Sequence, residues 1–244
     1  PRNELELHFQ PAVKLSSGGA LGVEALVRWR HPQRGLLPPG VFIPVAEESG
    51  LVLPVGRWVL NEACRQAAAW QDEHPGLQVA VNLSGWQLEQ PELVNEVAAV
   101  LERYALPPEV LVFELTETML MRDTETTIAK LHALKGLGIQ LAIDDFGTGY
   151  SSLRYLQRFP IDMLKIPKPF VDELAGAGTG GVMAGVILDL SARLGLGTIA
   201  EGIETEEQAE RLRELGCAWG QGYLFARPMP IEALLEFLRV GASA

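Results

Sequence analysis

Apolar and β-branched runs recur along the chain, and segments with a helical spacing of apolar residues lie between most of them. The runs predict strands at residues 5–9, 22–29, 78–83, 110–115, 140–143, 163–166, 198–200 and 222–225. Three sets of apolar residues each fall on one helix face: Leu93, Val97, Val100 and Leu101; Ile128, Leu131 and Leu134; and Ala209, Leu212 and Leu215. Thr205 and Gln208 have the spacing of a capping box, which predicts the start of the third helix.

The alternation of strands with helices is the main indication of fold. About eight strands alternating with helices in 244 residues is the profile of an α/β chain folded as a (β/α)₈ barrel. A doubly wound open sheet is the structural alternative, and the chain length favours the barrel. The one loose stretch, residues 175–181, is too short to separate two domains. We therefore expect residues 1–244 to form a single domain.

The composition is that of an ordinary globular domain with an acidic balance. Hydrophobic residues make up 48% of the chain, and its net charge is -11. Such a chain should not bind DNA, RNA or an anionic membrane through bulk electrostatics, and a phosphate ligand would need local cations. The best candidate for a membrane span, residues 182–196, is interrupted by Asp189 and Arg193. Cys64 and Cys217 are interpreted as small buried residues in a reducing compartment, so a cytoplasmic location is expected.

Polar residues stand at the ends of most of the later predicted strands. They are Glu24 and Arg28 in the second run, Asn82 in the third, Glu114 with Glu117 beyond the fourth, Asp144 and Asp145 after the fifth, Lys165 in the sixth, Glu201 with Glu204 beyond the seventh, and Gln221 beside the eighth. In a parallel barrel these strand ends meet on one face, where active sites are found. Any one of them alone is better explained as a solvated residue at a strand end. The presence of so many polar residues at corresponding strand ends predicts a functional site.

Several carboxylates in one pocket repel each other unless they share protons or bind cations. A set of oxygen ligands without His or Cys suits Mg²⁺ or Mn²⁺, and the adjacent Asp144 and Asp145 suit two neighbouring ions. Lys165 would add a positive charge or orient a water molecule, and its alternative role is a structural salt bridge. The glycine-rich residues 146–152 match neither a phosphate-binding P-loop nor a dinucleotide fingerprint. They indicate a tight loop over the metal pair or an ordinary strand-to-helix turn.

Taken together, these segments resemble the EAL family of cyclic di-GMP phosphodiesterases. The matching segments are Glu24-Ala25-Leu26 within GVEALVRWRHP, Asn82-Leu83-Ser84, Glu114-Leu115-Thr116-Glu117, Asp144-Asp145-Phe146-Gly147-Thr148-Gly149-Tyr150-Ser151-Ser152-Leu153, Leu164-Lys165-Ile166, Ala200-Glu201-Gly202-Ile203-Glu204-Thr205, Gly220-Gln221-Gly222-Tyr223, and the opening Phe9-Gln10-Pro11 and Phe42-Ile43-Pro44. The resemblance covers residues 5–230. The Glu-Ala-Leu triplet alone carries no weight, whereas the ordered set is highly specific.

The resemblance implies a modified TIM barrel whose first strand is antiparallel, and hydrolysis of cyclic di-GMP to linear pGpG with two Mg²⁺ or Mn²⁺ ions. By the same resemblance, Glu24, Asn82, Glu114 and Asp144 hold one metal, Asp144 and Asp145 serve the second, Lys165 and Glu201 position or deprotonate the attacking water, Glu117 anchors the loop after Asp145, and Gln10, Leu26, Arg28 and Gln221 contact the ligand. Arg28 is expected to reach a phosphate, as a forked donor favours.

One position departs from the family pattern. Pro167 stands where the family has an Asp two residues after the lysine, and proline removes both a carboxylate and a backbone donor. A receptor that binds cyclic di-GMP without cutting it is therefore an alternative, and an unrelated Mg²⁺-dependent barrel enzyme such as a lyase is a third. The chain starts at Pro1, so we expect it to come from a longer protein with an upstream sensor or diguanylate cyclase domain. The resemblance also implies a homodimer formed by helices near the loop after Asp145.

Overall fold

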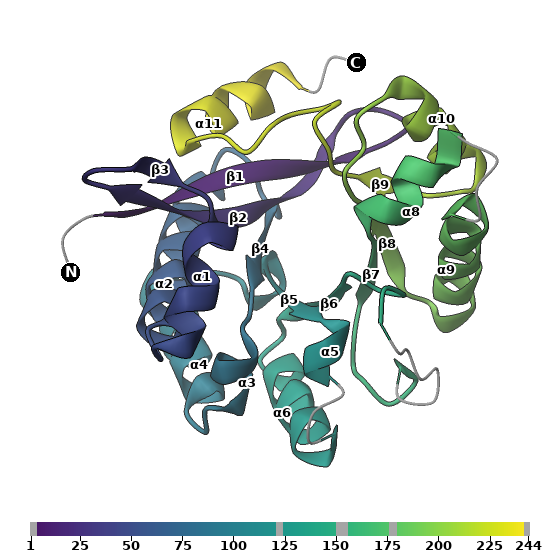
Figure 1. Ribbon diagram of the computed structural model, residues 1–244. Coiled ribbons are helices and arrows are strands. Elements are labelled where there is room, and N and C mark those ends of the chain that lie inside the picture. Colours follow the sequence, from purple (N-terminus) through teal and green to yellow (C-terminus); the bar gives the residue numbers. More distant parts are fainter. Residues whose placement is uncertain (1–3, 121–123, 150–155, 176–179, 242–244) are drawn as a thin grey trace.

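Strands surround a central axis, and helices lie mostly outside them, in the computed structural model, which describes residues 4–120, 124–149, 156–175 and 180–241 (Figure 1). The strands of the described residues are β1 (Leu5–Lys14), β2 (Ala20–His31), β3 (Gly35–Leu37), β4 (Gln78–Asn82), β5 (Leu111–Thr116), β6 (Gln140–Asp144), β7 (Met163–Ile166), β8 (Gly197–Ala200) and β9 (Trp219–Gly220). The helices are α1 (Pro39–Glu48), α2 (Val52–Trp70), α3 (Gly85–Glu89), α4 (Leu93–Tyr104), α5 (Glu117–Leu120), α6 (Thr124–Gly136), α8 (Lys168–Asp172), α9 (Gly180–Leu194), α10 (Glu206–Glu214) and α11 (Ile231–Val240), with short 3₁₀ turns η1 (Pro108–Val110) and η2 (Glu173–Ala175).

The sheet closes on itself. Its strand order is β1-β9-β8-β7-β6-β5-β4-β2-β3, and β1 also pairs with β2, so every strand except the short outer β3 belongs to a closed barrel. β1 is antiparallel to both of its neighbours, whereas the ladder from β2 through β4 to β9 is parallel. The prediction of a modified TIM barrel with an antiparallel first strand is confirmed. The open-sheet alternative is wrong, because β1 joins what would be the two free edges.

The prediction of a last strand at residues 222–225 is wrong. The chain is extended two residues earlier, in β9, and then turns: the amide groups of Phe225 and Ala226 both donate to the carbonyl of Gly222 at 3.1 Å. Gly222 is pressed so closely onto the loop after β8 that a Cβ there would lie 2.0 Å from the carbonyl oxygen of Ile203. A tight approach of two backbones, which only glycine allows, explains why an apolar run turns here.

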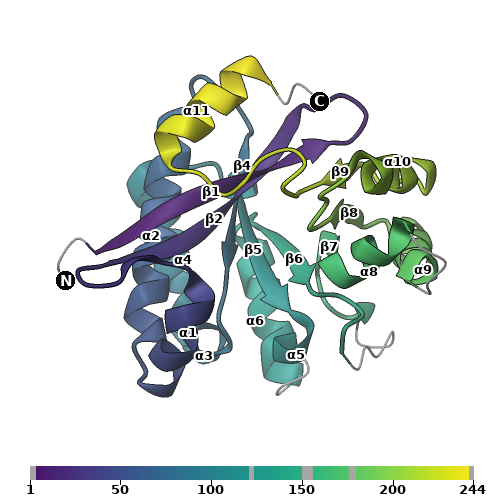
Figure 2. The same ribbon diagram turned by 45° about the horizontal axis from the view of Figure 1, so that its top comes forward.

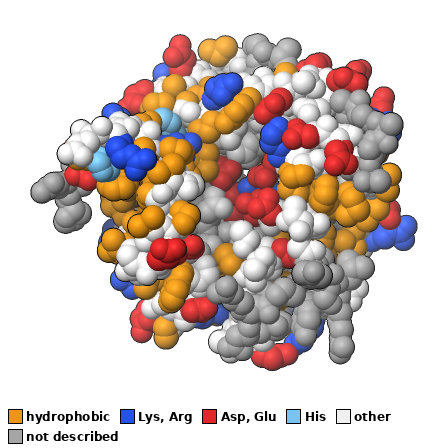
Figure 3. All heavy atoms as spheres, viewed as in Figure 1, with side chains coloured by type: hydrophobic (Ala, Val, Ile, Leu, Met, Phe, Trp, Pro, Cys, Tyr) orange, Lys and Arg blue, Asp and Glu red, His pale blue; other side chains and the backbone are white. Residues whose placement is uncertain are grey.

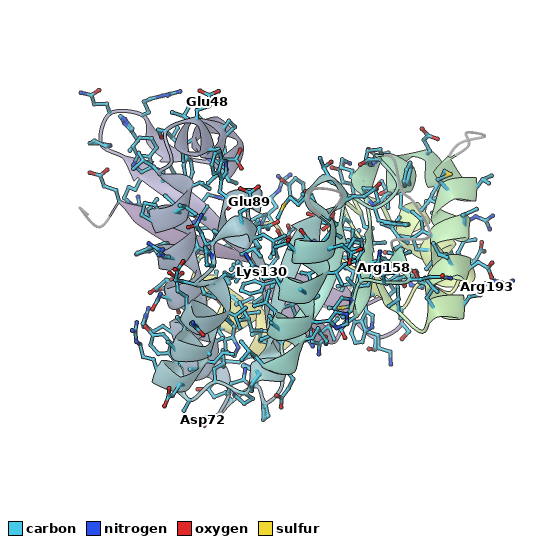
Figure 4. All side chains as sticks on the ribbon, turned by 90° about the horizontal axis from the view of Figure 1, so that it is seen from below. Glu48, Asp72, Glu89, Lys130, Arg158 and Arg193 are labelled. Atoms are coloured by element: carbon cyan, nitrogen blue, oxygen red, sulfur yellow. The ribbon has the colours of Figure 1, made fainter. Side chains whose placement is uncertain are left out.

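The predicted helices form with the expected faces inward. Leu93, Val97, Val100 and Leu101 of α4 are all buried, and so are Ile128, Leu131 and Leu134 of α6 and Ala209 and Leu212 of α10. Thr205 and Gln208 cap α10 reciprocally, as predicted. On the outside of the barrel, Lys130 of α6 donates to the carbonyl oxygens of Leu88 and Gln90 and so ties α6 to the end of α3 (Figure 4). Among the described helices, none combines the length and the apolar character needed to cross a membrane.

Two apolar clusters hold the fold together. The larger one lies between the outer face of the sheet and the helices, and it includes Phe9, whose ring meets that of Trp70 edge-on at 5.5 Å. Helix α11 lies along β1 and adds Leu234 to this cluster, and Met229 just before it pairs with Phe9 (Figure 2). The smaller cluster fills the barrel itself, and its buried members are Ala12, Val112, Ala142, Met163 and Ile199. We refer to this second cluster as the apolar layer.

Candidate active site

The candidate site lies directly above the apolar layer, on the same strands. Successive side chains alternate between the two faces of a strand, so the residue two positions further on points to the same interior. That step leads from Val112 to Glu114, from Ala142 to Asp144, from Met163 to Lys165 and from Ile199 to Glu201. On the antiparallel β1 the step is reversed and leads from Ala12 back to Gln10. Figure 3 shows the resulting acidic side chains gathered at the centre of this face.

Lys165 is the centre of the site. Its side chain is 1% exposed, and its Nζ lies 2.5 Å from Glu201 Oε1, 2.8 Å from Glu114 Oε2, 3.5 Å from Asp144 Oδ1 and 3.8 Å from Glu24 Oε2. Burial alone would lower the pKa of Lys165, but the charges of Glu114 and Glu201 raise it well above its usual range. The lysine is therefore a permanent cation among four carboxyl groups.

The carboxyl groups outnumber this cation. We refer to Glu24, Glu114, Asp144, Asp145 and Glu201 as the acidic ring. Burial, followed by the charge of Glu24, raises the pKa of Glu114 well above its usual range, and burial raises the pKa of Glu201 to about 8. The pKa of Asp145 is raised by burial and by its neighbour Asp144. Such shifts mark a site where negative charges are crowded together and a further cation would be stabilised.

Glu24 is held by two side-chain amide groups, one at the end of β4 and one directly after β9. Asn82 Nδ2 donates to Glu24 Oε1 at 2.7 Å, and Gln221 Nε2 donates to Glu24 Oε2 at 2.8 Å. Gln221 Nε2 also donates to Gln10 Oε1 at 3.1 Å, and Gln10 in turn donates to the carbonyl oxygen of Ala226. Burial would raise the pKa of Glu24, but the charge of Lys165 and these hydrogen bonds keep it below its ordinary value. Glu24 is therefore oriented as a carboxylate.

The donor set fits divalent cations. Asp144, Asp145 and Glu201 can each offer one oxygen so that the three atoms lie within 4.8 Å of one another. Asp145 has a left-handed backbone (φ 54°), and its amide group donates to Asp144 Oδ1 at 2.9 Å, which holds the Asp144 carboxyl at the start of the turn. Glu114 Oε2 is buried and accepts no well-aligned hydrogen bond from the described residues. Crowded oxygen ligands of this kind suit Mg²⁺ or Mn²⁺.

The loop after Asp145 is tied to the start of α5. Glu117 is 4% exposed, and its Oε2 accepts a hydrogen bond from the amide group of Gly147 at 3.1 Å. A Cβ at Gly149 would lie 3.2 Å from Glu117 Oε1, so this glycine lets the loop pass close to the carboxylate. The predicted loop extends to residue 152, and residues 150–152 lie outside the described part of the chain. Glu117 thus contacts the loop rather than the acidic ring.

A cavity of about 690 Å³ opens beside the acidic ring. Its lining includes Leu26, Ile43, Asn82, Trp86 and Met119. The sequence did not predict it, since its walls come from α1, α2, α3 and α5, which meet only in the folded chain. The small Gly56 and Gly85 among its walls are the available sequence signal.

Two arginines lie near the open side of the site. Arg28 donates to the carbonyl oxygen of Val27 at 3.0 Å, and burial lowers its pKa, while the nearby Tyr223 and Glu24 oppose that shift. The guanidinium carbon of Arg227 lies 4.2 Å from the centre of the Tyr223 ring. The sequence analysis missed this pair, although an aromatic residue and an arginine four positions apart could have indicated it.

Comparison with known proteins supports the same family. The sequence profile named EAL domain matches residues 1–228. The chain is 47% identical over 235 residues to the bifunctional diguanylate cyclase/cyclic di-GMP phosphodiesterase MucR of Pseudomonas aeruginosa, and 44% identical over 238 residues to the cyclic di-GMP phosphodiesterase NbdA of that species. It covers 34% and 30% of the lengths of these two relatives, which are longer proteins, and 96% and 97% of the chain is matched.

A solved structure with the same fold is described as the PaMucR phosphodiesterase in complex with c-di-GMP. It matches with a TM-score of 0.92 at 47% identity, over 96% of this chain and 95% of that one. The profile match over most of the chain excludes the alternative of an unrelated barrel enzyme in which the motif order is accidental. The resemblance inferred from the sequence motifs is confirmed, and this chain belongs to the EAL domain family.

Proposed function

We propose that this chain is a phosphodiesterase domain that hydrolyses one phosphodiester bond of cyclic di-GMP and releases linear pGpG. The observation that carries the proposal is the acidic ring around the buried Lys165 at the mouth of the barrel. The names of the relatives MucR and NbdA, and the c-di-GMP complex of the MucR domain, support the same substrate. The proposal covers residues 1–244 as one catalytic domain of a longer protein.

The acidic ring would hold two divalent cations, Mg²⁺ or Mn²⁺. Glu24, Asn82, Glu114 and Asp144 are proposed to hold one ion, and Asp144 and Asp145 the other. Bound ions would supply positive charge that stabilises the phosphoryl oxygens and lowers the pKa of a water molecule. Burial and neighbouring carboxyls raise the pKa values of Glu114, Asp145 and Glu201, and this supports the assignment, because bound cations would stabilise the carboxylates.

Lys165 and Glu201 are the proposed catalytic pair. The oxygen of a water molecule forms a bond to phosphorus as the bond from phosphorus to the 3′ oxygen breaks. The water gives up a proton, and the 3′ oxygen gains one. Burial raises the pKa of Glu201 to about 8 in the cation-free site, so bound cations would have to displace its proton before the carboxylate could accept the proton of the water, and Lys165 keeps that carboxyl oriented at 2.5 Å. Most of the rate enhancement would come from positioning and charge.

The residues at the edge of the site are the proposed ligand contacts. Arg28 is proposed to bind a phosphate, because a forked guanidinium donates two parallel hydrogen bonds to such a group. Gln10 and Gln221 lie side by side next to Glu24, and Leu26 borders the 690 Å³ cavity, which has room for one purine base. Glu117 is proposed to act only through the loop that it anchors at Gly147.

The test is incubation of the purified domain with cyclic di-GMP in Mg²⁺ or Mn²⁺, with EDTA as the control, followed by chromatography of the products. The proposal predicts pGpG only when metal is present. Intact cyclic di-GMP in every sample, with the nucleotide bound, would instead establish a receptor. Pro167 favours that second candidate, because it is buried at the start of α8 and offers no carboxylate at this position.

The domain is also proposed to act as a homodimer in the cytoplasm, downstream of a sensor or diguanylate cyclase domain. Val182 and Val186 of α9 are 65% and 53% exposed, and Ile187 of the same helix approaches Gly147 in the loop after Asp145. An apolar helix face beside this loop supports a dimer there. Light scattering of wild type and Val186→Asp with cyclic di-GMP checks it. A monomeric wild type at high concentration would contradict the dimer.

A further inference from the structure

Lys168 connects the turns that follow two neighbouring barrel strands. It lies three residues after Lys165, at the first position of α8, and its Nζ lies 2.7 Å from Asp172 Oδ1 and 3.0 Å from Glu204 Oε1. Asp172 belongs to its own helix, whereas Glu204 belongs to the turn between β8 and α10. The β8 turn also carries Glu201, so Lys168 reaches from one catalytic strand to the turn of the next.

The aliphatic part of Lys168 lies on the backbone beside Glu201. A Cβ added to Gly202 would come within 2.5–2.7 Å of Cβ, Cγ and Cδ of Lys168, so the methylene groups cover this glycine. Gly202 has a left-handed backbone (φ 67°), which favours glycine. The amide group of Glu201 donates to the carbonyl oxygen of Ile166 at 2.9 Å, which brings the two turns together on the other side.

The packing of the methylene groups of Lys168 restrains the β8 turn more than its ion pairs do. The side chains of Lys168, Asp172 and Glu204 are 45%, 46% and 48% exposed, and water screens ion pairs of such exposure. Pro167 precedes Lys168 and Pro169 follows it, and proline restricts the backbone at both positions, which limits how the segment that carries the lysine can move. The packing of that stem on Gly202 is therefore the part of the contact that restrains the turn.

We propose that Lys168 is a positioning residue, whose methylene stem holds the β8 turn so that Glu201 stays aligned with Lys165 and with the aspartates of the acidic ring. The kinetic consequence rests on the proposed phosphodiesterase function, and the consequence for cation binding does not. Lys168 touches none of the acidic ring side chains in the described contacts, and it acts through the backbone of Gly202.

The test compares Lys168→Ala, which removes the stem and the charge, with Lys168→Met, which removes only the charge. Arg65→Ala is the matched control, because Arg65 forms an exposed ion pair with Glu62 on α2, away from the site. Mn²⁺ is titrated into each nucleotide-free domain by calorimetry, and kcat and KM for cyclic di-GMP are measured separately. Circular dichroism checks that each variant is folded.

Lys168→Ala should weaken Mn²⁺ binding about tenfold, because supports of metal-binding side chains have effects of that order. Its kcat should fall on the order of tenfold while KM stays within about twofold, since the change displaces Glu201 and leaves the ligand contacts intact. Lys168→Met and Arg65→Ala should both match wild type. If Lys168→Ala does not fold, Lys168→Gln, with a shorter stem, should show a smaller loss in the same direction.

A Lys168→Ala variant that equals wild type in Mn²⁺ affinity and in kcat would overturn the proposal. Losses of Mn²⁺ affinity and kcat in Lys168→Met as large as those in Lys168→Ala would also overturn it, since the ion pairs would then be the restraint. Absence of turnover in wild type would reject the phosphodiesterase function and leave the Mn²⁺ comparison to decide the role of Lys168.

Discussion

The apolar layer and the acidic ring are built by the same strands of one barrel, and they face the same interior. Val112 and Glu114 are two residues apart on β5, and Met163 and Lys165 are two residues apart on β7. The lower member of each pair is an ordinary buried apolar side chain. The second member is a buried ionisable side chain, and its pKa is raised well above the usual range.

On each of these strands, the residue that stabilises the fold and the residue that belongs to the site lie two positions apart. Apolar burial is favourable without any particular orientation, so the lower layer stabilises the fold by itself. The acidic ring has more carboxyl groups than Lys165 can neutralise, so its charges are compensated only by shared protons or by bound cations. The same geometry that closes the barrel thus leaves a site at its mouth that favours divalent cations.

The largest effect is expected from placing an acid in the apolar layer. Val112→Glu puts an unpaired carboxyl where the wild-type side chain is 2% exposed, and this should destabilise the domain by about 5 kcal/mol or more, as much as many domains possess. Val112→Ala, the control for lost packing, should cost only about 1–3 kcal/mol. Urea denaturation measures both. A stably folded Val112→Glu would contradict the separation of the layers.

The next largest effect concerns the acidic ring. Asp144→Asn should lower turnover of cyclic di-GMP on the order of a thousandfold, because it removes the carboxylate proposed to serve both ions. Its far-ultraviolet circular dichroism should match wild type, since the apolar layer is untouched. Asp189→Asn, an exposed position on α9, is the control and should retain full turnover. Full activity in Asp144→Asn would remove the central residue from the proposed mechanism.

A smaller effect is expected from pH in the presence of EDTA. The pKa of Glu201 is about 8 in the folded domain against an ordinary value of 4.5, so the folded state keeps a proton that the unfolded chain has lost. Stability from this group is complete below about pH 4.5 and is lost as the pH rises towards about 8, by a few kcal/mol at most. Glu201→Gln should flatten that part of the profile. Urea denaturation of both proteins across this pH range measures the difference, and parallel profiles would argue against a raised pKa.

The smallest effect is expected from a conservative change in the apolar layer. Met163→Leu keeps the side-chain volume, and it should cost less than about 1.5 kcal/mol. Its kcat for cyclic di-GMP should remain close to that of wild type, although Lys165 is only two residues away. Thermal denaturation and steady-state kinetics check the two statements. A large loss of kcat without loss of stability would show that the two layers are coupled.

Much of the barrel and of the site could be predicted from the sequence, for a physical reason. Asn82, Glu114, Asp144, Lys165 and Glu201 each stand at or near the end of an apolar run, and the ends of parallel strands converge. Their order along the chain is therefore enough to predict that they meet. The antiparallel direction of β1 came only from the family resemblance, because the alternation of side chains is the same in either direction.

Features that depend on contacts between distant segments could not be predicted. The turn at residues 222–225 is set by the close approach of Gly222 to Ile203, which no local sequence pattern indicates. The cavity beside Asn82 depends on how α1, α2 and α3 pack, and the role of Lys168 depends on its lying against Gly202. Burial and the charge of Asp144 raise the pKa of Glu201 against the opposing effect of Lys165, so the shift exists only in the folded chain.

The most direct test of the account is calorimetric titration of Mn²⁺ into the EDTA-treated and dialysed domain, for wild type and for Asp144→Asn. The account predicts saturable binding to wild type and its loss or strong weakening in the variant, because the acidic ring needs cations to offset its charge. Equal binding by the two proteins, or no binding by wild type, would contradict the claim that the acidic ring is a divalent cation site.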